Sequence, residues 1–334
     1  MNNTSKNDPN YVLAGESGGS KTQMCLLNMK GAIIAEGFCP GVAAVRPGIF
    51  PVEASLAQGI RSLCASGTMS PNMISHCYFS LGGPNVAEVE KALRLTLPKA
   101  LIKIGREADG DLLMTCVPYF GCSAAVLAGT GTVAVGESGG KRIFSGGWGP
   151  DLDDAGSGGR IGREALSSVL LAMDGRAGKT SLCSMFGQFI KPGVDDDFNV
   201  RMALKKNVTA LSRKELAALA PDVYSHFLHG DEAAGAIIKD AARGIALLAN
   251  AVAGQDASGA KIRVMALGGL FKLGPEFRAL CAAHLADIND DAIFVFPEAF
   301  DLSRGACIMV LKQSGVPIDR SHDGFNSLKW KERN

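Results

Sequence analysis

Two stretches of the sequence decide the fold: Val12-Leu-Ala-Gly-Glu-Ser-Gly-Gly-Ser-Lys-Thr22 and Ala125-Val-Leu-Ala-Gly-Thr-Gly-Thr-Val-Ala-Val135. Each begins with an apolar run typical of a buried strand, continues into a turn of small and hydroxyl residues, and ends in a second apolar run. Glycines in such a turn let backbone N–H groups approach an anion closely, and hydroxyl groups add further donors. Two such turns, facing each other, predict a clamp that holds a polyphosphate between two lobes.

The sequence that follows each turn repeats the same plan. After the first turn, residues 23–28 and 32–37 indicate strands joined by Met29-Lys30-Gly31. After the second, residues 132–136 and 142–145 flank another short turn that contains two glycines. The chain is therefore predicted to contain two copies of one hairpin-led unit.

Strand and helix patterns alternate in the first part of the chain. Apolar residues recur at helical spacing in 51–64 and 86–97, and short apolar runs at 77–81 and 101–105 indicate strands. This alternation predicts an α/β fold. Beyond residue 160 the sequence favours helices, with 174–221 as an inserted helical segment. The remaining expected elements are strands at 262–267 and 292–296 and helices at 163–173, 213–220, 232–253, 275–285 and 305–312.

Length and composition restrict the classes of function. A chain of 334 residues exceeds what one hydrophobic core usually fills, so two domains are expected. Lys and Arg number 34 against 33 acidic residues, and this balance argues against nucleic acid as the main partner. No apolar run is long enough to cross a bilayer and no secretory signal is evident, so a cytoplasmic protein without a membrane partner is expected. The nine cysteines include no C-x-x-C pair and are expected to be free thiols.

A longer motif carries a resemblance to a known family. It is Ser145-Gly-Gly-Trp-Gly-Pro-Asp-Leu-Asp-Asp-Ala-Gly-Ser-Gly-Gly-Arg-Ile-Gly-Arg-Glu-Ala-Leu166, supported by Ala266-Leu-Gly-Gly-Leu-Phe271 and Gly230-Asp-Glu-Ala-Ala. With these motifs, nearly the whole chain resembles the BadF/BadG/BcrA/BcrD ATPase family. Within it, the chain is similar to the N-acetylglucosamine and glucosamine kinase group of the actin-like (ASKHA) superfamily.

The resemblance implies a two-lobed actin-like ATPase with duplicated RNase-H-like domains and a helical insertion in the second. The first lobe would span residues 1–117 and the second 118–334, with the tail packing back on the first lobe. The implied activity is transfer of the γ-phosphoryl group of ATP to an amino sugar such as N-acetylglucosamine or glucosamine, with Mg²⁺ in the cleft. A homodimer is common among similar proteins.

The resemblance also assigns the nucleotide contacts. The two turns would contact phosphate, and a glycine pair after the strand at 262–267 would approach adenine and ribose. These residues are Gly18, Gly19, Ser20, Lys21, Thr22, Gly129, Thr130, Gly131, Thr132, Gly268 and Gly269. As ordinary turn residues they would have no ligand.

Acidic residues in the first lobe receive the catalytic and metal roles. Asp109 is expected to be the general base, because it follows a strand where such kinases carry their catalytic Asp; the alternative is a helix cap. Glu16 stands where the family usually has an Asp that holds magnesium through water. Its extra methylene alters the geometry available to a metal that prefers regular octahedral coordination. The alternative for Glu16 is a solvated turn residue.

The sugar-side residues implied by the resemblance are Gly147, Trp148 and Asp154, with the carboxylate accepting hydrogen bonds from sugar hydroxyls. Two neighbours depart from the family pattern: Asp153 replaces a usual Gly and Ala155 a usual Glu. The segment 41–48 also lacks the Asn that such sugar kinases tend to carry. These departures leave the identity of the sugar open.

Two other functions remain alternatives. Ser17 also stands where the family usually has a Gly, and the departures at positions 16, 17, 153 and 155 are compatible with a nucleotide-binding regulator that has lost catalysis. An ATP-driven activator of a dehydratase, found in the same family, would need cysteines in a specific context at a subunit interface to hold an iron–sulfur cluster. No cysteine here lies in such a motif.

Overall fold

The computed structural model describes residues 11–17, 21–42, 52–82, 85–105, 110–189, 197–253, 261–297, 300–316 and 318. The chain divides into two compact units. Unit 1 comprises Met1–Gly121 and Pro297–Asn334, and unit 2 comprises Cys122–Phe296. The sequence-based division after residue 117 differs from this one, because the final helix of the chain packs on the sheet of unit 1.

Unit 1 is built on a five-stranded sheet of order β3-β2-β1-β4-β5. Its strands are β1 (Tyr11–Ser17), β2 (Lys21–Asn28), β3 (Ile33–Pro40), β4 (Ile74–Leu81) and β5 (Leu101–Gly105). The first three strands are antiparallel, whereas β1, β4 and β5 run parallel.

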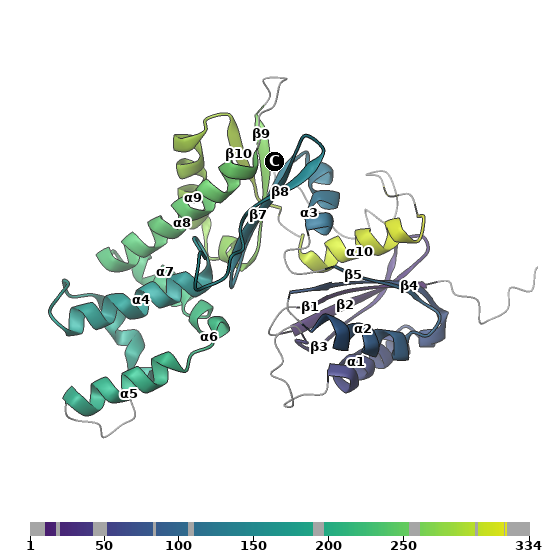
Figure 1. Ribbon diagram of the computed structural model, residues 1–334, viewed down its shortest axis with the longest axis horizontal. Coiled ribbons are helices and arrows are strands. Elements are labelled where there is room, and N and C mark those ends of the chain that lie inside the picture. The colour runs from purple at the N-terminus through teal and green to yellow at the C-terminus, as the bar shows by residue number, and fades with distance from the viewer. Residues whose placement is uncertain are drawn as a thin grey trace, which may run out of the picture. The chain divides into compact units, whose positions relative to one another are not determined.

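Helices cover both faces of the unit 1 sheet. Figure 1 shows α1 and α2 on one face and α10 on the other. Because both faces are covered, β1 and β4 carry nearly continuous runs of buried residues, as expected for central strands. The helices are α1 (Val52–Ser66), α2 (Val86–Thr96), α3 (Gly110–Cys116) and α10 (Leu302–Gln313), with 3₁₀ turns at Pro71–Met73 and Val117–Phe120.

Unit 2 repeats this topology. Its sheet has the order β10-β9-β6-β7-β8, with β6, β7 and β8 antiparallel and β6, β9 and β10 parallel. The strands are β6 (Ala124–Ala128), β7 (Thr132–Ser138), β8 (Lys141–Gly146), β9 (Ile262–Leu267) and β10 (Ala292–Val295). Three antiparallel strands followed by two parallel ones, in the same order twice, confirm the predicted duplication and α/β class.

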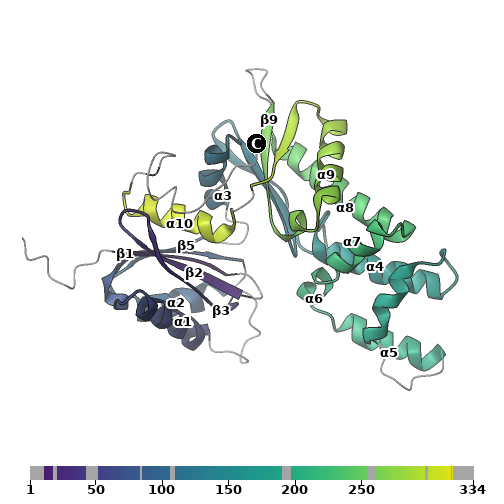
Figure 2. The same cartoon turned by 180° about the vertical axis from the view of Figure 1, so that it is seen from behind.

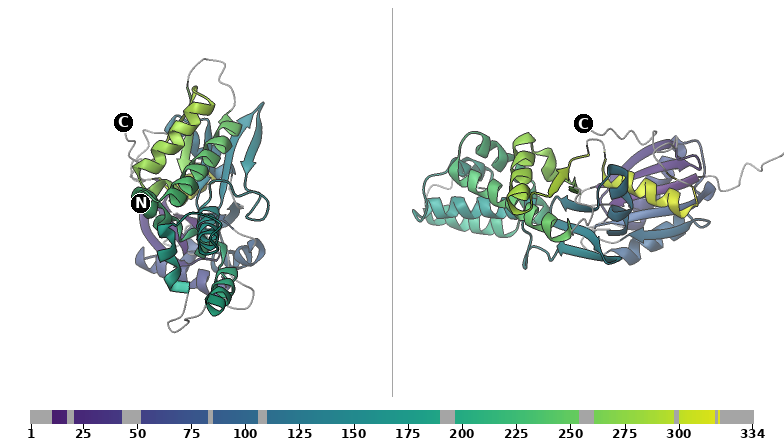
Figure 3. Two further views of the ribbon diagram at one scale, coloured as in Figure 1. Left: turned by 90° about the vertical axis from the view of Figure 1, so that its left-hand side faces the viewer. Right: turned by 90° about the horizontal axis from the view of Figure 1, so that it is seen from above.

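Unit 2 also carries the helical insertion, between β8 and β9 (Figure 2). Its long helix α8 packs across β6, β7 and β8 and runs beside α9, as Figure 3 also shows. Between β8 and β9 lie α4 (Gly158–Met173), a 3₁₀ helix (Ser181–Phe189), α5 (Asp197–Thr209), α6 (Arg213–Ala217), α7 (Ala220–Leu228) and α8 (Glu232–Ala253). A 3₁₀ turn (Gly269–Lys272) and α9 (Pro275–Ile288) follow β9. No helix in the described ranges is long and apolar enough to span a bilayer.

Candidate functional site

The turn between β6 and β7 is closed by its own backbone. Gly129 N donates a hydrogen bond to Gly131 O at 2.8 Å, where the paired residues Ala128 and Thr132 end the two strands. Thr130, at the tip, is exposed. The turn therefore presents its outer side to solvent while the strands below it are buried.

The start of α4 supports this turn from one side. Gly158 N donates to Gly129 O at 2.8 Å, and Gly159 N donates to Thr130 O at 3.2 Å. A Cβ added at either α4 glycine would lie 3.1 Å from the carbonyl oxygen that it serves. The Gly-Gly pair after Ser157, which caps the helix, thus lets α4 approach the turn closely, and its first N–H groups are used in doing so.

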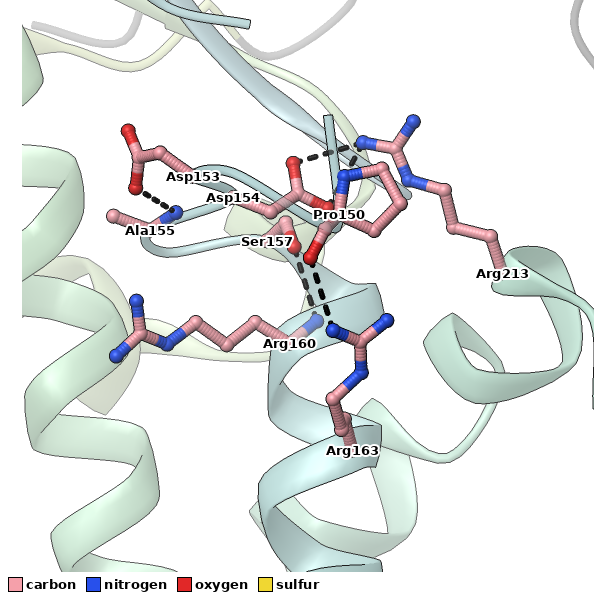
Figure 4. Close-up of polar contacts among 8 residues, drawn as sticks. All are labelled: Pro150, Asp153, Asp154, Ala155, Ser157, Arg160, Arg163 and Arg213. Carbon is pink, nitrogen blue, oxygen red and sulfur yellow. Dashed lines mark hydrogen bonds and ion pairs between the residues drawn. The ribbon is translucent and has the colours of Figure 1, made fainter. Parts of the chain in front are cut away.

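An ion pair lies against the same turn (Figure 4). Arg213, the first residue of α6, extends to Asp154, and its Nη2 donates to both carboxylate oxygens at 2.8 and 2.9 Å. Asp154 is only 6% exposed. A Cβ added at Gly131 would lie 2.2 Å from that Nη2 and 3.3 Å from Asp154 Oδ1. Only a glycine leaves the guanidinium its present position beside the turn.

This arrangement brings two sequence predictions together in one place. Asp154 was expected on the sugar side and Gly131 on the phosphate side, yet both contact one guanidinium. The carboxylate of Asp154 has Arg213 as its partner, so it is not free to accept hydrogen bonds from a sugar alone. Its neighbour Asp153 accepts a hydrogen bond from Ala155 N at 3.1 Å.

The glycines predicted to approach adenosine lie at the same edge of the sheet. β9 runs parallel to β6, and a Cβ on Gly268 would lie 2.1 Å from Ala128 O. Gly268 also has a φ of +113°, a backbone conformation that side chains rarely adopt. Gly269 has open space where its Cβ would stand. The structure thus places Gly268 directly beside the end of β6, which leads into the glycine turn.

Thr132 differs from the exposed Thr130. Its side chain is 4% exposed, and its Oγ1 is buried with no hydrogen-bond partner within the described ranges. Its carbonyl accepts from Gly147 N at 2.9 Å, which ties the predicted sugar-side segment to the hairpin. Buried hydroxyls nearly always have a partner, so an orphaned one beneath a glycine turn requires an explanation.

The segment after Gly147 exposes apolar side chains next to a pocket. Trp148 is 71% exposed and Leu152 is 80% exposed. Asp154 and Arg213 line a pocket of about 150 Å³ together with Leu152 and with Arg163, whose Nη1 donates to Pro150 O at 2.9 Å. Figure 4 shows these arginines approaching the segment from α4 and α6.

In unit 1, the end of β1 carries a perturbed carboxylate. Burial and, second to it, the nearby Asp301 carboxylate together raise the pKa of Glu16 to about 7, against the lowering effect of Lys21. Asp301 caps α10, accepting from Arg304 N at 3.1 Å and from Ser303 Oγ at 2.6 Å through one oxygen, Oδ1. A carboxylate at the end of β1 and one that caps α10 thus lie close enough to interact electrostatically.

The hydroxyls at the same hairpin bond to the protein itself. Ser17 Oγ and Thr22 Oγ1 lie 2.8 Å apart, Thr22 Oγ1 donates to Pro40 O at 3.1 Å, and Val42 N donates to Ser17 Oγ at 3.0 Å. Both side chains are fully buried. The Thr22 hydroxyl, expected to contact phosphate, is therefore engaged inside unit 1. Lys21 is exposed, with its ammonium 5.3 Å from the centre of the Phe38 ring.

Asp109, Gly18, Gly19 and Ser20 lie outside the described residues. Sequence reasoning missed two residues that the structure brings to the predicted sites, Arg213 and Asp301. Within the described ranges, no group of three or more histidine, cysteine or acidic residues is placed to hold a metal. Among the described residues, the candidate for a metal site is the pair of carboxylates at the end of β1 and at the N-cap of α10.

Comparison with known proteins agrees with this architecture. The chain is 28% identical over 239 residues to a glucosamine kinase of Vibrio cholerae, covering 71% of this chain and 78% of that protein. It is 35% identical over 128 residues to an N-acetylmuramic acid/N-acetylglucosamine kinase of Clostridium acetobutylicum, covering 38% and 40% of the two chains.

Solved structures show the same fold. A putative N-acetylglucosamine kinase from Chromobacterium violaceum aligns with a TM-score of 0.69 at 20% identity, covering 90% of this chain and 99% of that one. The sequence model of the BadF/BadG/BcrA/BcrD ATPase family matches residues 16–297, which is most of the chain. The protein therefore belongs to the BadF/BadG/BcrA/BcrD ATPase family.

Proposed function

We propose that this protein is an ATP-dependent kinase that phosphorylates an amino sugar of the glucosamine or N-acetylglucosamine type. Its family membership supports use of ATP, and the names of the kinases that it resembles support an amino sugar as acceptor. The observation that carries the proposal is the glycine turn of unit 2. It lies beside Gly268 at one sheet edge, with a guanidinium against it and an unpaired hydroxyl below.

The nucleotide would use this edge. Backbone N–H groups and hydroxyls of Gly129–Thr132 suit phosphate oxygens, and glycines at 268 and 269 leave space for close approach of a flat base and ribose. In each parallel pair of this sheet, the strands end together at this edge, where ligands of such folds bind. Gly18, Gly19 and Lys21 would supply the matching contacts from the first hairpin.

The carboxylates of Glu16 and Asp301 suit a magnesium ion. Hard oxygen donors are what Mg²⁺ prefers, and Asp301 Oδ2 has no partner among the described residues. A cation would also relieve the repulsion that raises the pKa of Glu16. When bound, the metal would neutralise charge on the phosphates during transfer.

Asp109 would act as the general base. β5 ends at Gly105, and the pairing of Gly105 with Ser80 and of Ser17 with Leu81 puts the ends of β1, β4 and β5 at one edge. β5 thus ends at the edge that carries Glu16, and Asp109 follows four residues later in the sequence. As the acceptor oxygen bonds to the γ-phosphorus and the bond to ADP breaks, the hydroxyl proton would pass to the Asp109 carboxylate.

The experiment is an acceptor panel. The purified protein is incubated with Mg-ATP and glucosamine, N-acetylglucosamine, N-acetylmuramic acid, glucose or no acceptor, and ADP release and sugar phosphate are measured. We expect amino-sugar-dependent ADP release with one sugar phosphate formed per ADP. Tight nucleotide binding without turnover on any acceptor would reject the kinase and favour the regulator, and acceptor-independent hydrolysis would reject it in favour of the ATP-driven activator.

A further inference from the structure

The guanidinium of Arg213 uses only part of its hydrogen-bonding capacity. One nitrogen, Nη2, serves both oxygens of Asp154, instead of the paired contact in which two nitrogens meet two oxygens. Nε is buried and has no partner within the described residues. No bond from Nη1 to any described residue is present either. The pair thus fixes the guanidinium through Nη2 and leaves Nη1 and Nε without a partner among the described residues.

Other polar groups of the β6–β7 hairpin also lack hydrogen-bond partners. Thr132 Oγ1, in the same hairpin, is buried and unpartnered, and no described residue accepts a hydrogen bond from Thr130 N or Gly131 N. All of these groups except the hydroxyl are donors only, and the hydroxyl can also donate. Gly131 lies directly beside the guanidinium, so this end of the hairpin offers a positive charge and unpaired donors, which suit an anion with several oxygens.

Local structure holds Arg213 in this position. A reciprocal capping box between Ser212 and Glu215 fixes the start of α6, so the residue that follows Ser212 has a defined direction. The stem of Arg213 lies over α4, with Cγ 3.4 Å from where a Cβ on Gly159 would stand. Figure 4 shows the side chain extending from α6 to Asp154. The nearly buried Asp154 then completes the orientation of the guanidinium.

We propose that Arg213 binds the phosphate oxygens of the nucleotide at the β6–β7 turn, and that Asp154 is a positioning residue for Arg213. This inference rests on the proposed function, because it takes a nucleoside polyphosphate as the ligand. It reassigns Asp154, which the family resemblance places on the sugar side. It also explains the glycine at position 131, where a Cβ would displace the guanidinium.

Calorimetric titration of ATP, ADP and adenosine into matched variants tests the inference. We expect Arg213→Met to weaken ATP and ADP binding by roughly 10- to 100-fold while adenosine binding is unchanged, since the lost contacts are hydrogen bonds to a charged group. Arg213→Lys should restore part of the affinity, and Asp154→Asn should give a smaller loss with the same selectivity. Arg201→Met removes another Arg–Asp pair of unit 2, at Asp174, and should change none of the affinities.

A second measurement uses the wild-type protein, in which the Arg213 side chain is intact. In the wild type, the buried Nε–H of Arg213 gives an NMR signal that Arg213→Lys identifies by its absence. We expect this signal to shift on addition of ATP or ADP and to stay in place with adenosine.

Equal loss of ATP and adenosine affinity in Arg213→Met, or no loss of either, would overturn the inference while leaving the kinase proposal intact. An Nε–H signal indifferent to ATP would overturn it as well, even if the variant failed to fold. A wild type that binds no adenine nucleotide at all would instead reject the proposed function, and the inference with it.

Discussion

The ends of the two hairpins have the same topology and opposite chemistry. In unit 1, the β1–β2 hairpin end carries the interacting carboxylates of Glu16 and Asp301, and its buried hydroxyls are bonded within the protein. In unit 2, the β6–β7 hairpin end carries the guanidinium of Arg213 and a buried hydroxyl without a partner. The first end suits a cation and the second suits an anion, which are the two parts of a metal–nucleotide complex.

This difference comes from what packs on each hairpin, since the strand order is shared. The capping Asp301 of α10 brings a second negative charge to Glu16. In unit 2, the start of α4 meets the turn and α6 brings a positive charge. Two copies of one fold can thus carry complementary sites when different helices pack against their equivalent hairpins.

The largest expected effect is on the rate of catalysis and concerns an acidic residue of unit 1. Asp109→Asn should lower kcat for sugar phosphorylation by roughly 10²- to 10⁴-fold, because the amide cannot accept the hydroxyl proton. Steady-state kinetics measures the loss, and ATP affinity should stay the same. Asp111→Asn, on the first turn of α3, is the control and should retain activity. Full activity of Asp109→Asn would contradict the role of Asp109 as the general base.

Alanine substitutions at the two glycines of the β6–β7 turn test whether ATP binding depends on the position of the Arg213 guanidinium. Gly131→Ala should weaken ATP binding by roughly tenfold, because its Cβ would lie 2.2 Å from Arg213 Nη2 and force the guanidinium away. Gly129→Ala has nothing within 4 Å of the added Cβ and should bind ATP as the wild type does. Calorimetry distinguishes the two. Equal affinities would mean that the position of the guanidinium does not matter.

Substitutions of Thr22 and Thr132 compare how much each hairpin's buried hydroxyl contributes to the free energy of unfolding. Thr22→Val should lower the free energy of unfolding by about 1–3 kcal/mol, because the buried Ser17 hydroxyl and the carbonyl of Pro40 lose their bonds to the Thr22 hydroxyl. Thr132→Val removes a hydroxyl with no partner and should change stability by less than about 0.5 kcal/mol or increase it. Urea unfolding measures both. A larger loss at Thr132 than at Thr22 would contradict the difference drawn between the hairpins.

The last expected effect is a pH dependence of the stability of the protein without magnesium. Burial raises the pKa of Glu16 from 4.5 to about 7, so the folded state retains a proton that the unfolded state has released. This contribution to stability is complete below pH 4.5 and is lost as pH rises through about 7, a change on the order of 3 kcal/mol. Urea unfolding in the presence of a chelator measures the free energy of unfolding at each pH. Across this window, that free energy should depend less steeply on pH in Glu16→Gln than in the wild type. Identical slopes would indicate that Glu16 is not perturbed.

Much of the fold follows from local sequence. The strands at 101–105 and 262–267 and the helix at 232–253 have the predicted bounds, because apolar run length and turn residues define them locally. α5 (Asp197–Thr209) was expected only as part of a helical insertion. Exposed apolar residues such as Phe198 and Met202 blur its helical pattern, so sequence gave no separate signal for it.

The site could be predicted only where its residues are neighbours in sequence. The glycine turn of unit 2 is local, and its position was evident. Arg213 lies 59 residues from Asp154, and the Ser212–Glu215 capping box indicates only that a helix begins there. Thr22 shows the converse: its side chain is a plausible phosphate donor by sequence, but pairing of β2 with β3 brings Pro40 O to its hydroxyl.

The central claim is that the carboxylates of unit 1 take the cation and the glycine turn of unit 2 takes the phosphates. A crystal structure grown with a non-hydrolysable ATP analogue and Mn²⁺, whose anomalous signal locates the metal, tests this most directly. We expect an anomalous peak beside Glu16 and Asp301 and phosphate density at residues 129–132 in contact with Arg213. Phosphates bound away from that turn, or a metal with no link to either carboxylate, would contradict it.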